Sequence, residues 1–461
     1  MEIEYNKLTI PDKDTDSVNT KNCSYCNKPF NKELWCKVCD PFRMMEGWTS
    51  ENLDIDKFIK DTMYNVRNKY VAYFDEFLEW VTFDRFTDIK EIGEGGFSKV
   101  FSATWIDGKS KYRKYDDGSY RKEEPKPLKV ALKRLNESQN MSDKYLNEFK
   151  IQWEMSNKSG VSLYGITKDP VTKEFIVIMK LADRGSLRSG LSNNFSSFLW
   201  EKKLTFLGGS LGGLYHLHRL GYLHKDFHSG NILRVNAEDS TRISDFGLSR
   251  PANEQTSDGK VYGVMPYIAP EVLNGEQYTS SADIYSFGVV MTELSSGKPP
   301  FHNKKHDLSL ALAICNGLRP EFGKGTPEFY KKLAYKCMNA NPNERPIADE
   351  LVDIFRFWYM SIYIGGEIEK FGYKGKEIKL AFEEADKEIQ NISISYEKNS
   401  DAVYTSRAFT FSNLLSKPVN SSIITSYINN EVSDSRLIDL EVFSNSIQLR
   451  DTGDENKVDI N

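Results

Sequence analysis

The pattern of apolar and polar positions divides the 461-residue chain into regions of different character. From about residue 83, short apolar runs bounded by turn residues predict β-strands. These strands are predicted at 87–92, 99–105, 128–135, 164–167 and 175–180. Longer apolar segments with helical spacing follow, and the clearest predicted helices are 198–220, 282–295 and 328–338. The order predicts one folded unit over residues 83–360, with a β-rich part followed by a helical part.

The segments before this unit are shorter and more polar. Residues 1–20 are polar and are expected to be disordered. Residues 44–82 are predicted to be a helical linker, in which Thr49 or Ser50 caps a helix over 49–68. The aromatic residues that follow this helix are expected to pack onto the next domain.

The segments after this unit lose apolar content. Residues 361–390 are predicted to be a helical extension, because 374–389 has apolar residues on one helical face. Residues 391–461 are rich in Ser, Asn and Asp and have no sustained periodicity. Such a composition cannot bury enough apolar surface to fold alone, so a disordered tail is predicted there.

Composition narrows the class of protein. The chain has 61 basic and 66 acidic residues and a net charge of −5, which argues against nucleic acid as a partner. Nothing in it approaches the roughly 18 apolar residues of a membrane span, so no membrane partner is expected. No signal peptide is visible and only six cysteines occur. These features favour a reducing compartment, the cytoplasm or alternatively the nucleus.

Four of the six cysteines lie within residues 21–43, as Cys23, Cys26, Cys36 and Cys39. Two Cys-x₂-Cys pairs can place four thiolates around Zn²⁺, so a closed structural zinc knuckle is predicted. A redox pair or two disulfides are the alternatives. A protein partner could bind at this knuckle or at the tail.

A glycine-rich turn joins the first two predicted strands. Glycines let backbone amides come close to phosphate groups, although a tight hairpin is the simpler explanation of such a turn. The residues expected to contact a nucleotide here are Ile92, Gly93, Glu94, Gly95, Gly96, Ser98 and Val100.

Lys133 ends a predicted buried strand, where its ammonium needs a partner. Phosphate oxygens and an acidic side chain from the predicted helix 143–154 are the expected partners of this ammonium. Glu148 is the first candidate and Glu154 the second. A solvated helix face is the alternative explanation for Glu148.

The segment 224–231 carries the strongest chemical pattern of the chain. Asp226, Asn231 five positions later, and Asp245 before Phe-Gly have the spacing of a phosphoryl-transfer site. Asp226 would accept or orient the proton of the attacking hydroxyl. Asn231 and Asp245 supply the hard oxygen ligands that Mg²⁺ prefers.

Three later segments are predicted to stabilise the fold rather than to take part in the chemistry. Ala269-Pro270-Glu271 closes the segment that Asp245 opens, and residues 283–288 lie in a predicted helix. Arg345 can pair with Glu271 through its planar guanidinium.

These motifs, in the order in which they occur along the chain, resemble a eukaryotic protein kinase domain. Within that family they are most similar to the tyrosine-kinase-like group. The resemblance implies an α+β bilobal fold, with a small antiparallel β lobe plus one helix and a larger, mainly helical lobe. It implies ATP and Mg²⁺ as cofactors and transfer of the γ-phosphate to a protein substrate, most simply on Ser or Thr. Asp226 becomes the catalytic base, and Lys133 binds the α- and β-phosphates and pairs with Glu148.

The resemblance also implies how the adenine is held. Met179 looks like the gatekeeper, and Lys180-Leu181-Ala182 looks like the hinge beside the ring. Val100 and Ala131 would cover the ring from above.

The chain departs from the family at a few positions. His228 stands where serine/threonine kinases have Lys, and Val264 stands where they have Thr. His228 either donates to the phosphate or only packs beside the loop. Gln152 replaces a usual apolar residue, and Lys225 suggests control by phosphorylation near 256–262. A pseudokinase scaffold that binds nucleotide or partners is the alternative to an active enzyme.

Overall fold

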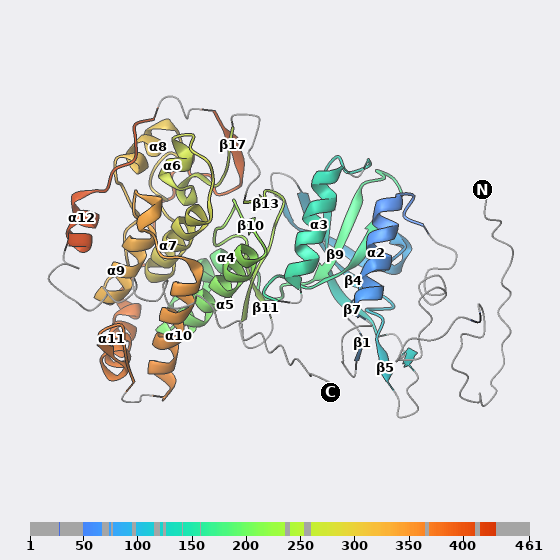
Figure 1. The fold of residues 1–461 in the computed structure, drawn as a ribbon, viewed down its shortest axis with the longest axis horizontal. Helices are drawn as coiled ribbons and strands as arrows, with labels where there is room; N and C mark the ends of the chain where they lie inside the picture. Colours follow the sequence, from blue (N-terminus) through green and yellow to red (C-terminus); the bar gives the residue numbers. More distant parts are fainter. Residues whose placement is uncertain are drawn as a thin grey trace, which may run out of the picture.

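The computed structural model describes a part of the chain that holds both predicted lobes (Figure 1). The described residues are Asn27, 49–66, 73–74, 77–94, 98–114, 120–122, 126–140, 142–156, 158–235, 240–252, 260–364, 368–410 and 415–429. Residues 1–20 and the four clustered cysteines lie outside this part. The disordered N-terminus and the zinc knuckle therefore stay predictions.

The small lobe is built on a six-stranded sheet with the order β2-β8-β9-β7-β4-β3. Its strands are β2 Glu79–Trp80, β3 Phe86–Glu94, β4 Ser98–Trp105, β7 Leu128–Leu135, β8 Leu163–Lys168 and β9 Phe175–Lys180. The central strand β9 is a nearly continuous apolar run and is buried along almost its whole length, and β7 is buried from Val130 to Lys133. All pairs are antiparallel except β2 with β8.

Two helices lie against one face of this sheet, α2 Leu53–Val66 and α3 Asp143–Ser156 (Figure 1). Ile55 and Ile59 of α2 share an apolar cluster with Phe149 and Trp153 of α3. The side chain of Asn52, rather than Thr49 or Ser50, caps α2, since Asn52 Oδ1 accepts from the amides of residues 54 and 55 at 3.1 Å.

The predicted helical linker is helical only in its first half. Its second half contains the short strands β1 Tyr73–Phe74 and β2. Strand β2 extends the small-lobe sheet, and Phe77 and Leu78 before it are buried in the same cluster as α2. The prediction was wrong here because β2 takes its hydrogen bonds from β8, about 85 residues further along the chain, which no local pattern reveals. Strand β1 pairs with the hairpin β5 Tyr112–Lys114 and β6 Tyr120–Lys122.

The large lobe is helical and packs around a helix buried on nearly every side, α7 Ser280–Ser296. The other helices are α4 Leu187–Asn194, α5 Trp200–Arg219, α6 Pro270–Leu273, α8 Leu308–Cys315, α9 Glu328–Cys337 and α10 Ala348–Ile364. Short strands carry the loops of the site: β10 Tyr222–Leu223, β11 Ile232–Val235, β12 Ser240–Ile243, β13 Arg250–Pro251 and β14 Val261–Gly263. Single 3₁₀ turns are η1 Phe83–Arg85, η2 Phe195–Ser197, η3 Met265–Tyr267, η4 Pro342–Glu344 and η5 Ile389–Asn391.

The ion pair expected between Arg345 and Glu271 is present and buried. The two guanidinium nitrogens donate to the two carboxylate oxygens at 2.6 and 2.7 Å. This bidentate contact ties the turn η4 to α6.

The extension after the predicted unit contains a hairpin and a helix, β15 Glu369–Lys370, β16 Tyr373–Lys374 and α11 Gly375–Glu388. The helix packs against α5, where the rings of Phe382 and Trp200 are 5.3 Å apart. Within the described residues, no helix has both the length and the apolar character that a membrane crossing needs.

The predicted disordered tail is wrong for residues 391–410 and 415–429, which pack on the large lobe. Strand β17 Arg407–Phe409 pairs with β14, and helix α12 Ser422–Asn429 packs on α9. A few buried apolar residues, such as Phe409 and Ile424, supply the contacts that the Ser- and Asn-rich composition conceals. Residues 430–461 lie outside the described part of the chain.

Candidate active site

Lys133, Glu148 and Asp245 meet between the two lobes. Lys133 extends from β7, and its Nζ lies 2.6 Å from Glu148 Oε1 of α3 and 3.0 Å from Asp245 Oδ1 of the large lobe. Burial alone would lower the pKa of Lys133, but the two carboxylates outweigh it and raise that pKa. Burial likewise opposes ionisation of Asp245, yet Lys133 lowers its pKa overall. The lysine is therefore a fixed cation that joins one lobe to the other.

A cavity of about 10 Å³ lies behind this ion pair, lined in part by Gln152 and Met179. This volume is about that of one water molecule. The polar side chain of Gln152 is buried, and its Nε2 donates to the carbonyl of Val161 at 2.6 Å. The unusual glutamine is thus satisfied by the backbone rather than disturbing the pair formed by Lys133.

The predicted nucleotide-contacting residues lie on adjacent strands of the small lobe. In the sheet register, Val100 of β4 lies opposite Lys133 of β7, and Ala131 of β7 lies opposite Met179 of β9. Ala182 follows the end of β9. Since paired residues and alternate residues share one face of a sheet, Val100, Ala131 and Met179 lie on the same face as Lys133.

The glycine-rich turn is described at its two ends. Ile92, Gly93 and Glu94 end β3, and Ser98 begins β4. Gly93 has open space where a Cβ would point. Gly95 and Gly96 lie outside the described residues, so their contact with phosphates stays a prediction.

Asp226 and Asn231 face each other within the loop that joins β10 to β11. Asn231 Nδ2 donates to the Asp226 carbonyl at 3.0 Å and lies 3.4 Å from Asp226 Oδ2. With its amide nitrogen used in this way, the Asn231 oxygen is left as the acceptor. Carboxylate and amide oxygens are ligands that Mg²⁺ prefers, so this oxygen and the Asp245 carboxylate stay the predicted Mg²⁺ ligands.

His228 is buried beside Asp226. Its Nδ1 accepts the amide of Gly230 at 3.0 Å, which leaves Nε2 as the ring N–H. Nε2 lies 3.6 Å from Asp226 Oδ1. The ring is therefore turned toward the carboxylate, while it also contacts Tyr267 with the ring centroids 5.7 Å apart.

Asp283 of α7 holds the loop before Asp226. Its carboxylate accepts from the amides of His224 at 2.8 Å and Lys225 at 3.1 Å, and from Tyr278 at 2.7 Å. Lys225 has a φ of +65°, a left-handed conformation that costs of order 1–3 kcal/mol in a residue other than glycine. The buried carboxylate stabilises this strained backbone and so sets the direction of Asp226.

The segment from Asp245 to Glu271 is described only at its ends. Val264 is buried in the core of the large lobe, and Tyr262 lies in β14. Thr256 and Ser257, two of the predicted phosphorylation sites, lie outside the described residues.

Sequence reasoning missed the residues of the C-terminal segment, defined as residues 391–410, that reach this site. The hydroxyl of Ser406 donates to Asp226 Oδ2. Arg188 of α4 donates to the Tyr404 carbonyl at 3.0 Å. The alternation of Arg407, Ala408 and Phe409 is a strand signal, but three residues are too few to stand out in a Ser-rich tail.

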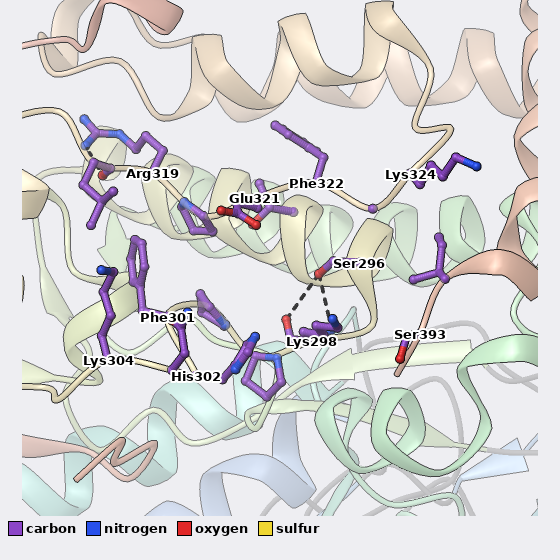
Figure 2. Close-up of a pocket in the computed structure, with 18 of the residues that line it drawn as sticks. Ser296, Lys298, Phe301, His302, Lys304, Arg319, Glu321, Phe322, Lys324 and Ser393 are labelled. Atoms are coloured by element: carbon purple, nitrogen blue, oxygen red, sulfur yellow. Dashed lines mark hydrogen bonds between the residues drawn. The ribbon is translucent and has the colours of Figure 1, made fainter. Parts of the chain in front are cut away.

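A larger pocket of about 430 Å³ lies elsewhere in the large lobe (Figure 2). Its wall combines Ser296, Lys298 and Lys304 with Lys324 and with Ser393 of the C-terminal segment. None of the described residues that line it belongs to the predicted site. The cleft at Lys133 and Asp226 is therefore the candidate active site, and this pocket is separate from it.

Comparison with known proteins agrees with this geometry. Residues 86–355, more than half of the chain, match the family described as protein tyrosine and serine/threonine kinase. The chain is 28% identical over 267 residues to a protein named as a probable serine/threonine-protein kinase of Dictyostelium discoideum, covering 57% of this chain and 15% of that protein.

Two further relatives come from other lineages. Similarity to the tyrosine-protein kinase TXK of Homo sapiens is 29% identity over 267 residues, or 57% of this chain and 46% of TXK. A leaf rust 10 disease-resistance locus receptor-like protein kinase of Arabidopsis thaliana is 28% identical over 291 residues, 58% of this chain and 41% of that protein. The chain thus spans less than half the length of each of these three relatives.

Proposed function

This chain belongs to the protein tyrosine and serine/threonine kinase family, and we propose that it transfers the γ-phosphate of ATP to a Ser or Thr hydroxyl of a protein substrate. The observation that carries the proposal is the contact of Lys133 with both Glu148 and Asp245, at 2.6 and 3.0 Å. It brings the phosphate-binding lysine of one lobe to the metal-binding acid of the other. Asp226 and Asn231 complete the set of groups that the reaction needs.

Each residue has a separate task in the proposed reaction. Lys133 binds the α- and β-phosphates, and Glu148 holds the lysine in place. Asp226 orients the attacking hydroxyl and takes its proton. Asn231 and Asp245 would hold Mg²⁺, which supplies positive charge against the phosphate oxygens when it is bound. The adenine would lie between Ala131 and the hinge segment that ends at Ala182.

The decisive test compares the native protein with Asp226→Asn in a radiolabelled ATP transfer assay, with myelin basic protein as the added acceptor. Loss of the carboxylate should lower the rate roughly 10²- to 10⁴-fold, the usual contribution of a positioned general base. The matched control is Asp349→Asn, an exposed carboxylate on α10 whose loss should leave the rate unchanged. Equal rates for native protein and Asp226→Asn would favour the pseudokinase scaffold instead.

Phosphoamino-acid analysis of the labelled product then separates the two acceptor classes. Phosphoserine or phosphothreonine supports the proposal, whereas phosphotyrosine alone contradicts the choice of acceptor while leaving a kinase activity in place.

We also propose that Cys23, Cys26, Cys36 and Cys39 bind a structural Zn²⁺ in a reducing compartment, because two Cys-x₂-Cys pairs favour tetrahedral thiolate ligation. Such a knuckle could carry a protein partner. A Cys36→Ser protein that keeps one equivalent of zinc would contradict the assignment.

A further inference from the structure

The C-terminal segment follows a defined path from the end of α11 to the active site. It begins at the wall of the large pocket, where Ser393 lies near the loop that carries Lys298 and His302 (Figure 2). The ring of Tyr396 lies 4.4 Å from that of His302, and the amide of residue 399 donates to the His302 carbonyl at 2.8 Å. The segment ends in β17, on the side of the large lobe that faces the small lobe (Figure 1). Contacts between the C-terminal segment and the surface of the large lobe therefore direct the segment toward the cleft.

Tyr404 anchors the segment just before it reaches Asp226. Its hydroxyl donates to the Pro300 carbonyl at 2.9 Å, and its ring packs edge-on against His306 with the centroids 4.9 Å apart. Arg188 stacks its guanidinium over the ring and donates to the Tyr404 carbonyl at 3.0 Å. Arg188 is itself held from below by the buried carboxylate of Glu293, 3.9 Å away. Several groups of the large lobe thus hold Tyr404 together, so the anchor does not depend on one flexible side chain.

Strand pairing fixes the segment just after Asp226. Arg407, Ala408 and Phe409 pair antiparallel with Gly263, Tyr262 and Val261 of β14. Phe409 is buried in the main apolar cluster of the large lobe. The extended backbone is therefore clamped on both sides of a single residue, Ser406, in the manner of a peptide added to a strand edge.

Ser406 is presented to the group that would take its proton. Its hydroxyl donates to Asp226 Oδ2, the oxygen that also lies 3.4 Å from Asn231 Nδ2. The other oxygen, Oδ1, faces His228. The neighbouring Thr405 is exposed, so the register brings one of the two adjacent hydroxyls to the carboxylate.

We propose that Ser406 is a phosphoacceptor in cis, so that this chain phosphorylates its own C-terminal segment. The inference rests on the kinase function proposed above. In the reaction, Ser406 Oγ forms a bond to the γ-phosphorus of ATP while the bond from that phosphorus to the bridging oxygen of the β-phosphate breaks. The hydroxyl proton passes to Asp226, and ADP leaves with the bonding electron pair.

The product should not stay where the reactant was held. A phosphoserine carries a charge of about −1.5 to −2 at neutral pH, and it would stand beside the Asp226 carboxylate. Like-charge repulsion replaces the hydrogen bond between Ser406 and Asp226. Modification therefore releases the segment from the cleft and opens the site to other protein substrates.

The test uses the full chain, first treated with a phosphatase and then incubated with labelled ATP and Mg²⁺, with myelin basic protein present in parallel reactions. Fragmentation mass spectrometry distinguishes Ser406 from Thr405. We expect label on Ser406 in the native protein and in Thr405→Ala, at a rate constant that does not change with protein concentration. Ser406→Ala should lose the label from this peptide, and it should label myelin basic protein more slowly than the phosphorylated native protein, because its segment is not expelled from the cleft.

Three results would overturn the inference. Label on myelin basic protein without label on Ser406 would leave the kinase function intact and reject the acceptor. A rate constant that rises with protein concentration would show transfer between molecules rather than within one. No label on any acceptor, with intact nucleotide binding, would reject the proposed function and the acceptor together.

Discussion

At the scale of single residues, His228 lies beside Asp226 in the proposed active site. The usual lysine at this position is a long point charge, whereas His228 is a buried ring with Nε2 3.6 Å from Asp226 Oδ1. Its orientation is set by the amide of Gly230, which donates to Nδ1 at 3.0 Å. The ring is therefore prepared to donate either to Asp226 or to a phosphate oxygen that approaches it. This position favours a part in the reaction over simple packing beside the loop.

His228→Ala should lower kcat about two- to thirteenfold, because one hydrogen bond of about 0.5–1.5 kcal/mol is lost in the transition state. His228→Gln keeps an N–H donor and should lose less. Steady-state kinetics with varied ATP measures both, and His216→Ala on α5 serves as the histidine control. An unchanged kcat in His228→Ala would mean that the ring only packs beside the loop.

At the scale of elements, the contact between α5 and α11 contains a buried lysine. Lys203 Nζ makes no hydrogen bond to any residue that the structure describes. It lies over the rings of Phe195 and Trp200, 4.3 and 4.8 Å from their centroids. Burial lowers the pKa of Lys203 to about 7, although the Asp386 carboxylate of α11 opposes the shift. This helix pair is therefore less stable than its apolar residues alone would make it.

The lowered pKa predicts how stability depends on pH. Above pH 7 the folded state releases the Lys203 proton, whereas the unfolded chain keeps it up to its ordinary pKa, so the unfolded state binds more protons. Stability should then rise with pH, by at most about 1.4 kcal/mol per unit from this group. Below pH 7 both states are protonated and the full penalty remains.

Lys203→Met should therefore be more stable than the native protein at pH 7, and the difference should shrink between pH 7 and pH 9. The difference stops shrinking as the pH approaches 10.5, the ordinary pKa of lysine, because the unfolded chain then loses the Lys203 proton as well. Urea unfolding at pH 7, 8 and 9 measures the change, with Lys202→Met as the neighbouring control. A difference that stays constant over this range would contradict the lowered pKa of Lys203.

At the scale of the whole molecule, the C-terminal segment connects parts of the large lobe that are far apart in sequence. It contacts the loop that carries Pro300, the end of α4 through Arg188, and the segment before the Pro-Glu element through β14. Order in β14 therefore depends on an anchor at Tyr404 that is more than 140 residues away along the chain. Weakening the contacts of Tyr404 should therefore lower the local stability of β14.

Tyr404→Ala removes the hydrogen bond to Pro300 and the ring contacts with Arg188 and His306. Amide hydrogen exchange should rise roughly tenfold or more both in 407–409 and in 261–263, because about 1.5–3 kcal/mol of local stability is lost. Mass spectrometry of proteolytic peptides measures both segments. Tyr359→Ala, an exposed tyrosine of α10, is the control, and unchanged exchange in 261–263 would show that β14 does not depend on β17.

Much of the fold and of the site could be predicted from local patterns. The boundaries of β7 and β9 agree with the predicted strands, because the middle of β7 and nearly all of β9 are buried and these positions are mainly apolar. The partner of Lys133 could be chosen from helical spacing and the need to neutralise a buried cation. The cap of α2 could not be predicted, because Thr49 and Ser50 are as suitable as Asn52. The strand β2 could not be predicted either, because it forms only by pairing with β8.

The sequence by itself determined the two lobes and the residues that meet in the cleft, because strand and helix periodicity and the spacing of Asp226, Asn231 and Asp245 are local properties. Only the tertiary structure decided what else lies there. Ser406 reaches Asp226 from 180 positions away, through anchors that are spread over the large lobe. Such a contact depends on the shape of the surface on which the segment docks, and the composition of a Ser-rich segment carries no sign of that surface.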